Sequence, residues 1–152
     1  MIDLPSAPPP ALCPPPEGPP PTLLLASEPQ SVCHARDFVR EVIGRRAPDA
    51  SGQHIDVVVL VTSELVTNAY RYGTEPGDLI RVAIDAGRGR TRVEVHDPVR
   101  RMPRHRFMSD DRNHERTRGR GLVILDALCP TRWGFGVRPL GKFVWAEVLR
   151  PR

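Results

Sequence analysis

A carboxylate and a carboxamide, Glu64 and Asn68, stand four residues apart in the most regular apolar stretch of the chain. Within residues 57–73, apolar side chains recur at steps of three and four, which predicts a helix with one buried face, ended at Gly73 by a left-handed cap. Four residues make about one helical turn, so the two polar groups lie on one line beside that face. A carboxylate can polarise a water or a hydroxyl, and an amide oxygen can bind Mg²⁺. The same spacing also occurs on solvated helix edges, so the pair alone leaves both interpretations open.

An aspartate and two glycines are the other candidates for binding residues. Asp97 ends an alternating stretch and is followed by Pro98, which prevents further strand pairing. A carboxylate at the end of a strand can accept a hydrogen bond from an amino group such as that of adenine, although Asp-Pro is also an ordinary turn starter. Gly119 and Gly121 precede an apolar helix, where glycines let backbone N–H groups approach an anion.

The segment between these features, residues 100–120, is rich in arginine and has no sustained periodicity. Long loops of this kind in compact domains are often lids, and a basic lid could close over phosphates. The loop could equally contact nucleic acid, but Phe107 is its only aromatic side chain of the kind that stacks on bases. We therefore expect no direct binding of nucleic acid.

The composition indicates a single domain with its own core. A chain of 152 residues is long enough to fold without a metal or disulfide, and its three cysteines contain no C-x-x-C pair, which favours a reducing cytoplasm. No apolar run is long enough to span a membrane, and the N-terminus lacks a secretion signal. The formal charge of +4 permits nucleic acid or an acidic protein partner.

The remaining patterns predict the elements that position the candidate residues. Prolines concentrate in residues 1–21, which we expect to be a disordered tail ahead of a domain over residues 22–150. A helix is expected from Ser27 or Glu28 to about Arg45. The expected strands are residues 22–26, 79–84, 91–96, 133–137 and 143–149.

Three motifs, in this order, resemble those of the GHKL-type ATP-binding domains. S-E-L-V-T-N-A-Y-R-Y-G, from Ser63, resembles the N-box, and G-R-G-L-V-I-L-D-A-L, from Gly119, resembles the second glycine box. W-G-F-G-V-R-P-L-G-K-F-V-W-A-E-V, from Trp133, resembles the final hairpin. The resemblance covers about residues 22–149 and is closer to the small anti-sigma-factor serine kinases than to the histidine-kinase domains. It implies an α+β fold, a two-layer sandwich whose mixed, mostly antiparallel sheet carries helices on one face.

The resemblance also implies ATP and Mg²⁺ as cofactors, bound between helices and lid. Glu64 would be the general base, Asn68 the Mg²⁺ ligand, and Asp97 the partner of the adenine amino group. Arg36 matches an arginine of the family's first helix and would assist catalysis near the γ-phosphate or contact the protein partner. The phosphates would be held by the second glycine box, at Gly119, Arg120, Gly121 and Leu122.

The resemblance implies an anti-sigma-factor serine/threonine kinase that transfers the γ-phosphate of ATP to a serine of a partner protein. The partner would be a sigma factor or an anti-anti-sigma-type substrate, and related kinases suggest a homodimer. The alternative is a weak or inactive domain of the same fold that sequesters a regulatory protein. Three departures from the family pattern bear on this choice. Val99 replaces the glycine that usually stands two residues after the aspartate. Phe143 replaces a threonine, and Tyr72 replaces a histidine.

Overall fold

A five-stranded sheet in the order β1-β2-β3-β5-β4 is the centre of the fold. The computed structural model of the chain describes residues 19–98 and 124–151. Every pairing between neighbouring strands is antiparallel. The strands are β1 (Thr22–Ala26), β2 (Leu79–Ala86), β3 (Arg90–Asp97), β4 (Trp133–Arg138) and β5 (Gly141–Leu149).

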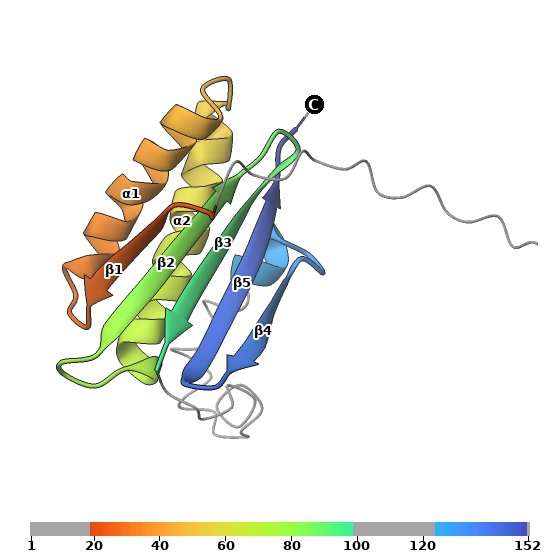
Figure 1. The fold of residues 1–152 in the computed structure, drawn as a ribbon. Helices are drawn as coiled ribbons and strands as arrows, with labels where there is room; N and C mark the ends of the chain where they lie inside the picture. Colours follow the sequence, from red (N-terminus) through yellow and green to blue (C-terminus); the bar gives the residue numbers. More distant parts are fainter. Residues whose placement is uncertain (1–18, 99–123, 152) are drawn as a thin grey trace, which may run out of the picture.

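Two long helices, α1 (Ser31–Arg46) and α2 (Gly52–Asn68), cover one face of this sheet, behind it in Figure 1. Residues 124–128 form a short further helix before β4. This arrangement confirms the predicted α+β fold with helices on one face, and the described part of the sheet is antiparallel throughout.

Both helices begin where a serine side chain binds backbone. The predicted start of the first helix at Ser27 or Glu28 is wrong, because α1 begins at Ser31 after a turn closed by a bond from Ser31 N–H to Glu28 O (3.1 Å). Ser31 Oγ also donates to Ala26 O at 2.6 Å, which ties the helix to the end of β1. The second helix begins earlier than residue 57, since Ser51 caps it by accepting a bond from His54 N–H at 3.1 Å.

The core lies between the helices and the inner face of the sheet. The buried stripe of α2 packs on alternate residues of the central strands, as the period-two side-chain pattern of a strand requires. The fully buried side chains include Val39, Ile43, Val58, Val61, Val66, Ile80, Val82, Ile84, Val93, Val95 and Leu125. The periodic apolar positions predicted for α2 are therefore its core face.

Two predictions fall outside the described residues. They are the proline-rich tail, up to residue 18, and the basic lid of residues 100–120. In the part of the chain that is described, no helix combines the length and apolarity needed to cross a bilayer.

Candidate functional site

Glu64 and Asn68 lie on the last two turns of α2. Both side chains are half-buried, whereas their neighbours Leu65 and Val66 are buried in the core. This places the pair beside the core face, as the helical spacing predicts. Neither side chain forms a hydrogen bond or ion pair with another described residue, so the carboxylate and the amide keep their capacity to bind a ligand.

Arg36 reaches this part of α2 from α1. Its Nε donates to Ser63 Oγ at 2.7 Å, and Ser63 Oγ in turn donates to Val59 O at 2.7 Å. The arginine is therefore held beside the residue that precedes Glu64. Sequence reasoning placed Arg36 on the first helix but did not identify Ser63 as its partner, because the packing of two helices sets that contact.

Asp97 lies at the end of β3, in a buried ion pair with Lys142 of β5. The carboxylate Oδ1 accepts a bond from Lys142 Nζ at 3.0 Å, and the two residues are only 7% and 9% exposed. They are directly opposite one another in the β3–β5 register. The low polarity of this site makes the pair costly to break, because one charge would be left buried alone. Lys142 is a site residue that the sequence interpretation missed.

Gly73 brings the end of the α2 segment against Asp97. The predicted left-handed cap at Gly73 is wrong: among the described glycines only Gly77 has a positive φ, and residues Ala69–Gly73 continue the helix as a π-helical turn. The glycine is required for space instead, since a Cβ at this position would lie 2.5 Å from Asp97 Oδ2. The aspartate therefore lies in a cradle that any larger residue at position 73 would fill.

Gly141 also lies very close to Asp97, and there too the absence of a side chain is required. A Cβ there would collide with the backbone carbonyl oxygen of Asp97. Glycine therefore lets β5 start close to the end of β3, and this start positions Lys142 over the Asp97 carboxylate.

Phe143 points away from Asp97, to the opposite face of the sheet. Successive strand residues alternate faces, and since Lys142 is on the face of Asp97, Phe143 is on the other. Its ring stacks on His96, with the ring centroids 5.0 Å apart. The replacement of a threonine by Phe143 therefore does not change the cradle around Asp97, because the side chain at position 143 does not face it.

The second glycine box, with Gly119, Arg120, Gly121 and Leu122, lies outside the described residues, as does Val99. Tyr72 is half-buried in the π-helical turn, next to Gly73. In the described part, the candidate residues thus come from the end of α2, from α1 beside it, and from Asp97 in contact with the turn that follows α2.

The donor set fits a nucleotide accompanied by Mg²⁺. Asn68 offers one amide oxygen and Glu64 one carboxylate, which are hard oxygen ligands. The described residues hold no group of three His, Cys, Asp or Glu side chains arranged for a metal ion. A single protein oxygen is enough where the phosphates of a nucleotide supply further ligands, and Mg²⁺ commonly binds in this way. The cradle around Asp97 supplies a buried carboxylate of the kind that recognises an amino group.

Comparison with protein families assigns this architecture to a known class of domain. The model of the histidine kinase-like ATPase domain matches residues 25–131, more than half of the 152-residue chain. The chain therefore belongs to the histidine kinase-like ATPase domain family, and membership implies nucleotide binding. No curated protein sequence matches the chain significantly.

A solved structure shares the fold. The crystal structure of the RsbU and RsbW domains of Rv1364c from Mycobacterium tuberculosis superposes with a TM-score of 0.57 at 22% sequence identity. The alignment covers 88% of this chain and 33% of that chain, so the present chain spans about a third of the compared protein. At this identity the likeness supports the fold.

Proposed function

We propose that this chain binds ATP with Mg²⁺ at the C-terminal end of α2 and acts as a serine/threonine kinase on a regulatory partner protein. The observation that carries the proposal is the half-buried Glu64 and Asn68 pair, free of other described partners, on a helix whose following turn contacts a buried aspartate. Family membership supports the nucleotide, and the RsbW domain of the structural neighbour favours a regulatory partner.

Each residue would have a distinct task in this proposal. Asn68 would ligate Mg²⁺ through its amide oxygen, and Asp97 would accept a bond from the adenine amino group. Bound Mg²⁺ and nearby cations neutralise the charge that spreads over the transferred phosphoryl group. Glu64 would orient the serine hydroxyl of the partner and accept its proton.

Arg36 and the glycine box would complete the site. Arg36 is held at Ser63, one residue from Glu64, and would supply positive charge near the γ-phosphate or bind the partner. The backbone N–H groups from Gly119 to Leu122, with the Arg120 side chain, would hold the phosphates, as expected where glycines open a helix. The partner would be a sigma factor or an anti-anti-sigma-type protein, and the boundaries of the domain would be residues 22 and 150.

A second candidate function rests on the Asp97–Lys142 ion pair. Because Lys142 Nζ already occupies Asp97 Oδ1, an adenine amino group must share the carboxylate with a buried cation. This competition favours weak nucleotide binding, and hence a domain that sequesters a regulatory protein without phosphorylating it.

Nucleotide binding is tested by thermal unfolding with ATP, with and without Mg²⁺. A ligand that binds only the folded state at a hundred times its Kd stabilises it by about 2.7 kcal/mol. The parent chain should show this increase, and Asp97→Asn should reduce it. Asp56→Asn is the matched control, because Asp56 is exposed on the first turns of α2. If ATP does not stabilise the parent at any concentration, the proposal is wrong.

Phosphate transfer separates the two candidates. Glu64→Gln should retain the ATP-induced stabilisation but lose transfer of labelled phosphate to candidate anti-anti-sigma proteins. Glu41→Gln, on the exposed side of α1, should leave transfer unchanged. Absence of transfer by an ATP-binding parent chain that still forms a stable complex with its partner would establish the sequestering domain instead.

A further inference from the structure

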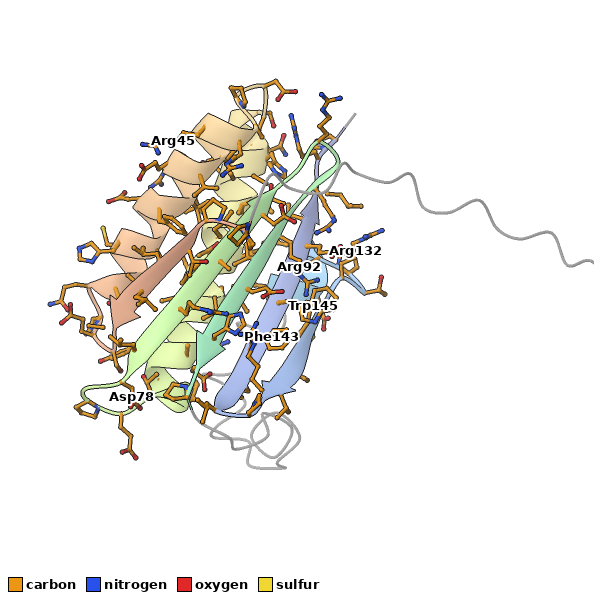
Figure 2. The ribbon with its side chains drawn as sticks, viewed as in Figure 1. Arg45, Asp78, Arg92, Arg132, Phe143 and Trp145 are labelled. Atoms are coloured by element: carbon orange, nitrogen blue, oxygen red, sulfur yellow. The ribbon has the colours of Figure 1, made fainter. Side chains whose placement is uncertain are left out.

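The outer face of the sheet, which α1 and α2 do not cover, carries aromatic and charged side chains from four strands. Figure 2 shows Arg92, Phe143 and Trp145 on this face, over β3 and β5. The two rings lie over glycines of β4, since a Cβ at Gly134 or Gly136 would press on Trp145 or collide with Phe143. The aromatic rings therefore form a flat layer on the sheet.

In the upper half of this face, the arginines form ion pairs with carboxylates. Arg92 binds Glu94 at 3.0 Å and Glu147 at 3.1 Å, and its guanidinium lies 4.5 Å from the centre of the Trp145 ring. Glu147 also accepts a bond from Arg132 at 3.4 Å and forms an ion pair with Arg90 at 3.3 Å. Each of these arginines thus has a carboxylate within ion-pair distance, which makes this half less attractive to an anion.

The lower end of the face differs, because two arginines there have no counter-charge among the described residues. Arg81 of β2 and Arg138 of β4 line a cavity of about 210 Å³ together with His96 of β3. Neither guanidinium forms an ion pair with any carboxylate of the described residues. Arg138 lies 5.5 Å from the centre of the Phe143 ring, which leaves its N–H donors available. Lys142 and Asp97 also border the cavity, but their charges cancel in their own ion pair.

His96 is the third cationic candidate in this cavity, and the charges of both arginines affect its pKa. The residue is 7% exposed, and its Nε2 bonds Glu94 Oε2 at 3.0 Å while Nδ1 has no partner among the described residues. Burial lowers the pKa of His96, and the charges of Arg138 and Arg81 lower it further, against the opposite effect of Glu94. The two guanidinium charges thus disfavour protonation of the buried ring, and a bound anion would favour it.

We propose that Arg81, His96 and Arg138 form a binding site for the carboxylate of an acidic residue in a partner protein. Guanidinium forks match a carboxylate in geometry as well as charge. The rim is apolar, because Leu79 is 56% and Leu140 82% exposed beside the same cavity. A carboxylate between apolar neighbours on a peptide fits both the cationic floor and this rim.

Arg81 and His96 lie on the other face of the sheet from the Asp97 carboxylate, although Asp97 and Lys142 border the same cavity. His96 and Asp97 are consecutive in β3, so their side chains leave the sheet on opposite faces. Arg81 is paired with His96 across β2 and β3, and therefore shares the outer face. A partner bound here would contact the domain without covering the end of α2.

The test is a titration of the full chain with the capped tripeptide acetyl-Leu-Glu-Leu-amide, followed by NMR of the His96 ring at constant ionic strength. The ring signal should shift saturably and the pKa of His96 should rise, since the bound carboxylate stabilises the protonated ring. The double variant Arg81→Gln/Arg138→Gln should weaken binding by at least about tenfold. The matched control is Arg40→Gln/Arg45→Gln, which removes two exposed arginines of α1 and should change nothing.

Four outcomes would overturn the proposal. The first is an equal shift with acetyl-Leu-Gln-Leu-amide, which lacks the charge. The second is unchanged binding by the folded Arg81→Gln/Arg138→Gln variant, and the third is no saturable shift in the parent. The fourth is a shift with inorganic phosphate but none with the glutamate peptide, which would assign the site to phosphate. Stabilisation by ATP should be the same in this variant and the parent, so failure here is distinguishable from failure of the nucleotide proposal.

Discussion

Replacing Gly73 with alanine tests whether space for Asp97, and not a backbone conformation, requires glycine at the end of the α2 segment. The new Cβ would lie 2.5 Å from Asp97 Oδ2 and 2.6 Å from Asp97 Cγ. Carbon atoms pack at about 3.5–4.0 Å, so the carboxylate must move by roughly 1 Å. The carboxylate is buried and bonded to Lys142 at 3.0 Å, and it cannot move without straining that ion pair. Overpacking of this kind costs about 1–3 kcal/mol.

Gly44→Ala is the matched control, because Gly44 lies in α1 and a Cβ there meets nothing within 4 Å. Alanine favours a helix interior over glycine by about 0.5–1 kcal/mol, which applies to Gly44 but not in full to Gly73, the last residue of the π-helical turn. The difference between the two variants therefore contains the steric cost, about 1–3 kcal/mol, and this smaller difference in helix preference. For a chain of this length each kcal/mol shifts Tm by about 2–4 °C.

Thermal and urea unfolding of the two variants, followed by circular dichroism, measure this difference. We expect Gly44→Ala to be slightly more stable than the parent and Gly73→Ala to be clearly less stable than Gly44→Ala. If Gly73→Ala gains as much stability as Gly44→Ala, the close contact with Asp97 is wrong. A loss of ATP-induced stabilisation in Gly73→Ala would further support Asp97 as part of the nucleotide site.

Three further predictions follow from buried groups. Lys142→Met should lower the free energy of unfolding by about 3–5 kcal/mol, because it leaves the Asp97 charge buried alone, and adding Asp97→Asn should recover part of that loss in urea unfolding. Burial, followed by the charge of Arg150, lowers the pKa of His54 below 6.5, so the neutral ring is favoured in the fold. Stability should therefore fall as pH decreases below about 6.5, less steeply in His54→Gln, and equal slopes in the two chains would contradict this. Burial raises the pKa of Cys129 to about 11, so iodoacetamide at pH 8 should label exposed Cys33 in the folded chain and Cys129 only after unfolding, as mass spectrometry can check.

The sequence was informative wherever a side-chain pattern is local. The spacing of apolar residues in α2 located its buried face, and the same periodicity placed Glu64 and Asn68 half-buried one turn apart. Alternation located β2 and β3, since residues on one face of a strand recur at every second position, and a short apolar run located β1. Helix starts were less predictable: Ser51 caps α2, whereas the N-cap of α1 is Gln30, which forms no side-chain cap bond.

The contacts between distant segments required the tertiary structure. Lys142 appears in the sequence as part of a turn, and only the register of β3 against β5 places it opposite Asp97. The same register turns Phe143 to the outer face, where its ring stacks on His96. The sequence predicts a helix cap at Gly73, because a glycine at a helix end usually has that role. In the structure, glycine is required at this position because a side chain would collide with Asp97.

The sequence by itself indicated the class of domain, through motifs whose residues are close together in the chain. The tertiary structure decided which charges neutralise one another: Asp97 with Lys142 near the proposed nucleotide site, and Arg92 with Glu94 and Glu147 on the outer face. It also left Arg81 and Arg138 without a described counter-charge. The physical reason is that Coulomb interactions depend on distance in space and on burial, and strand pairing sets both for residues that the chain keeps far apart.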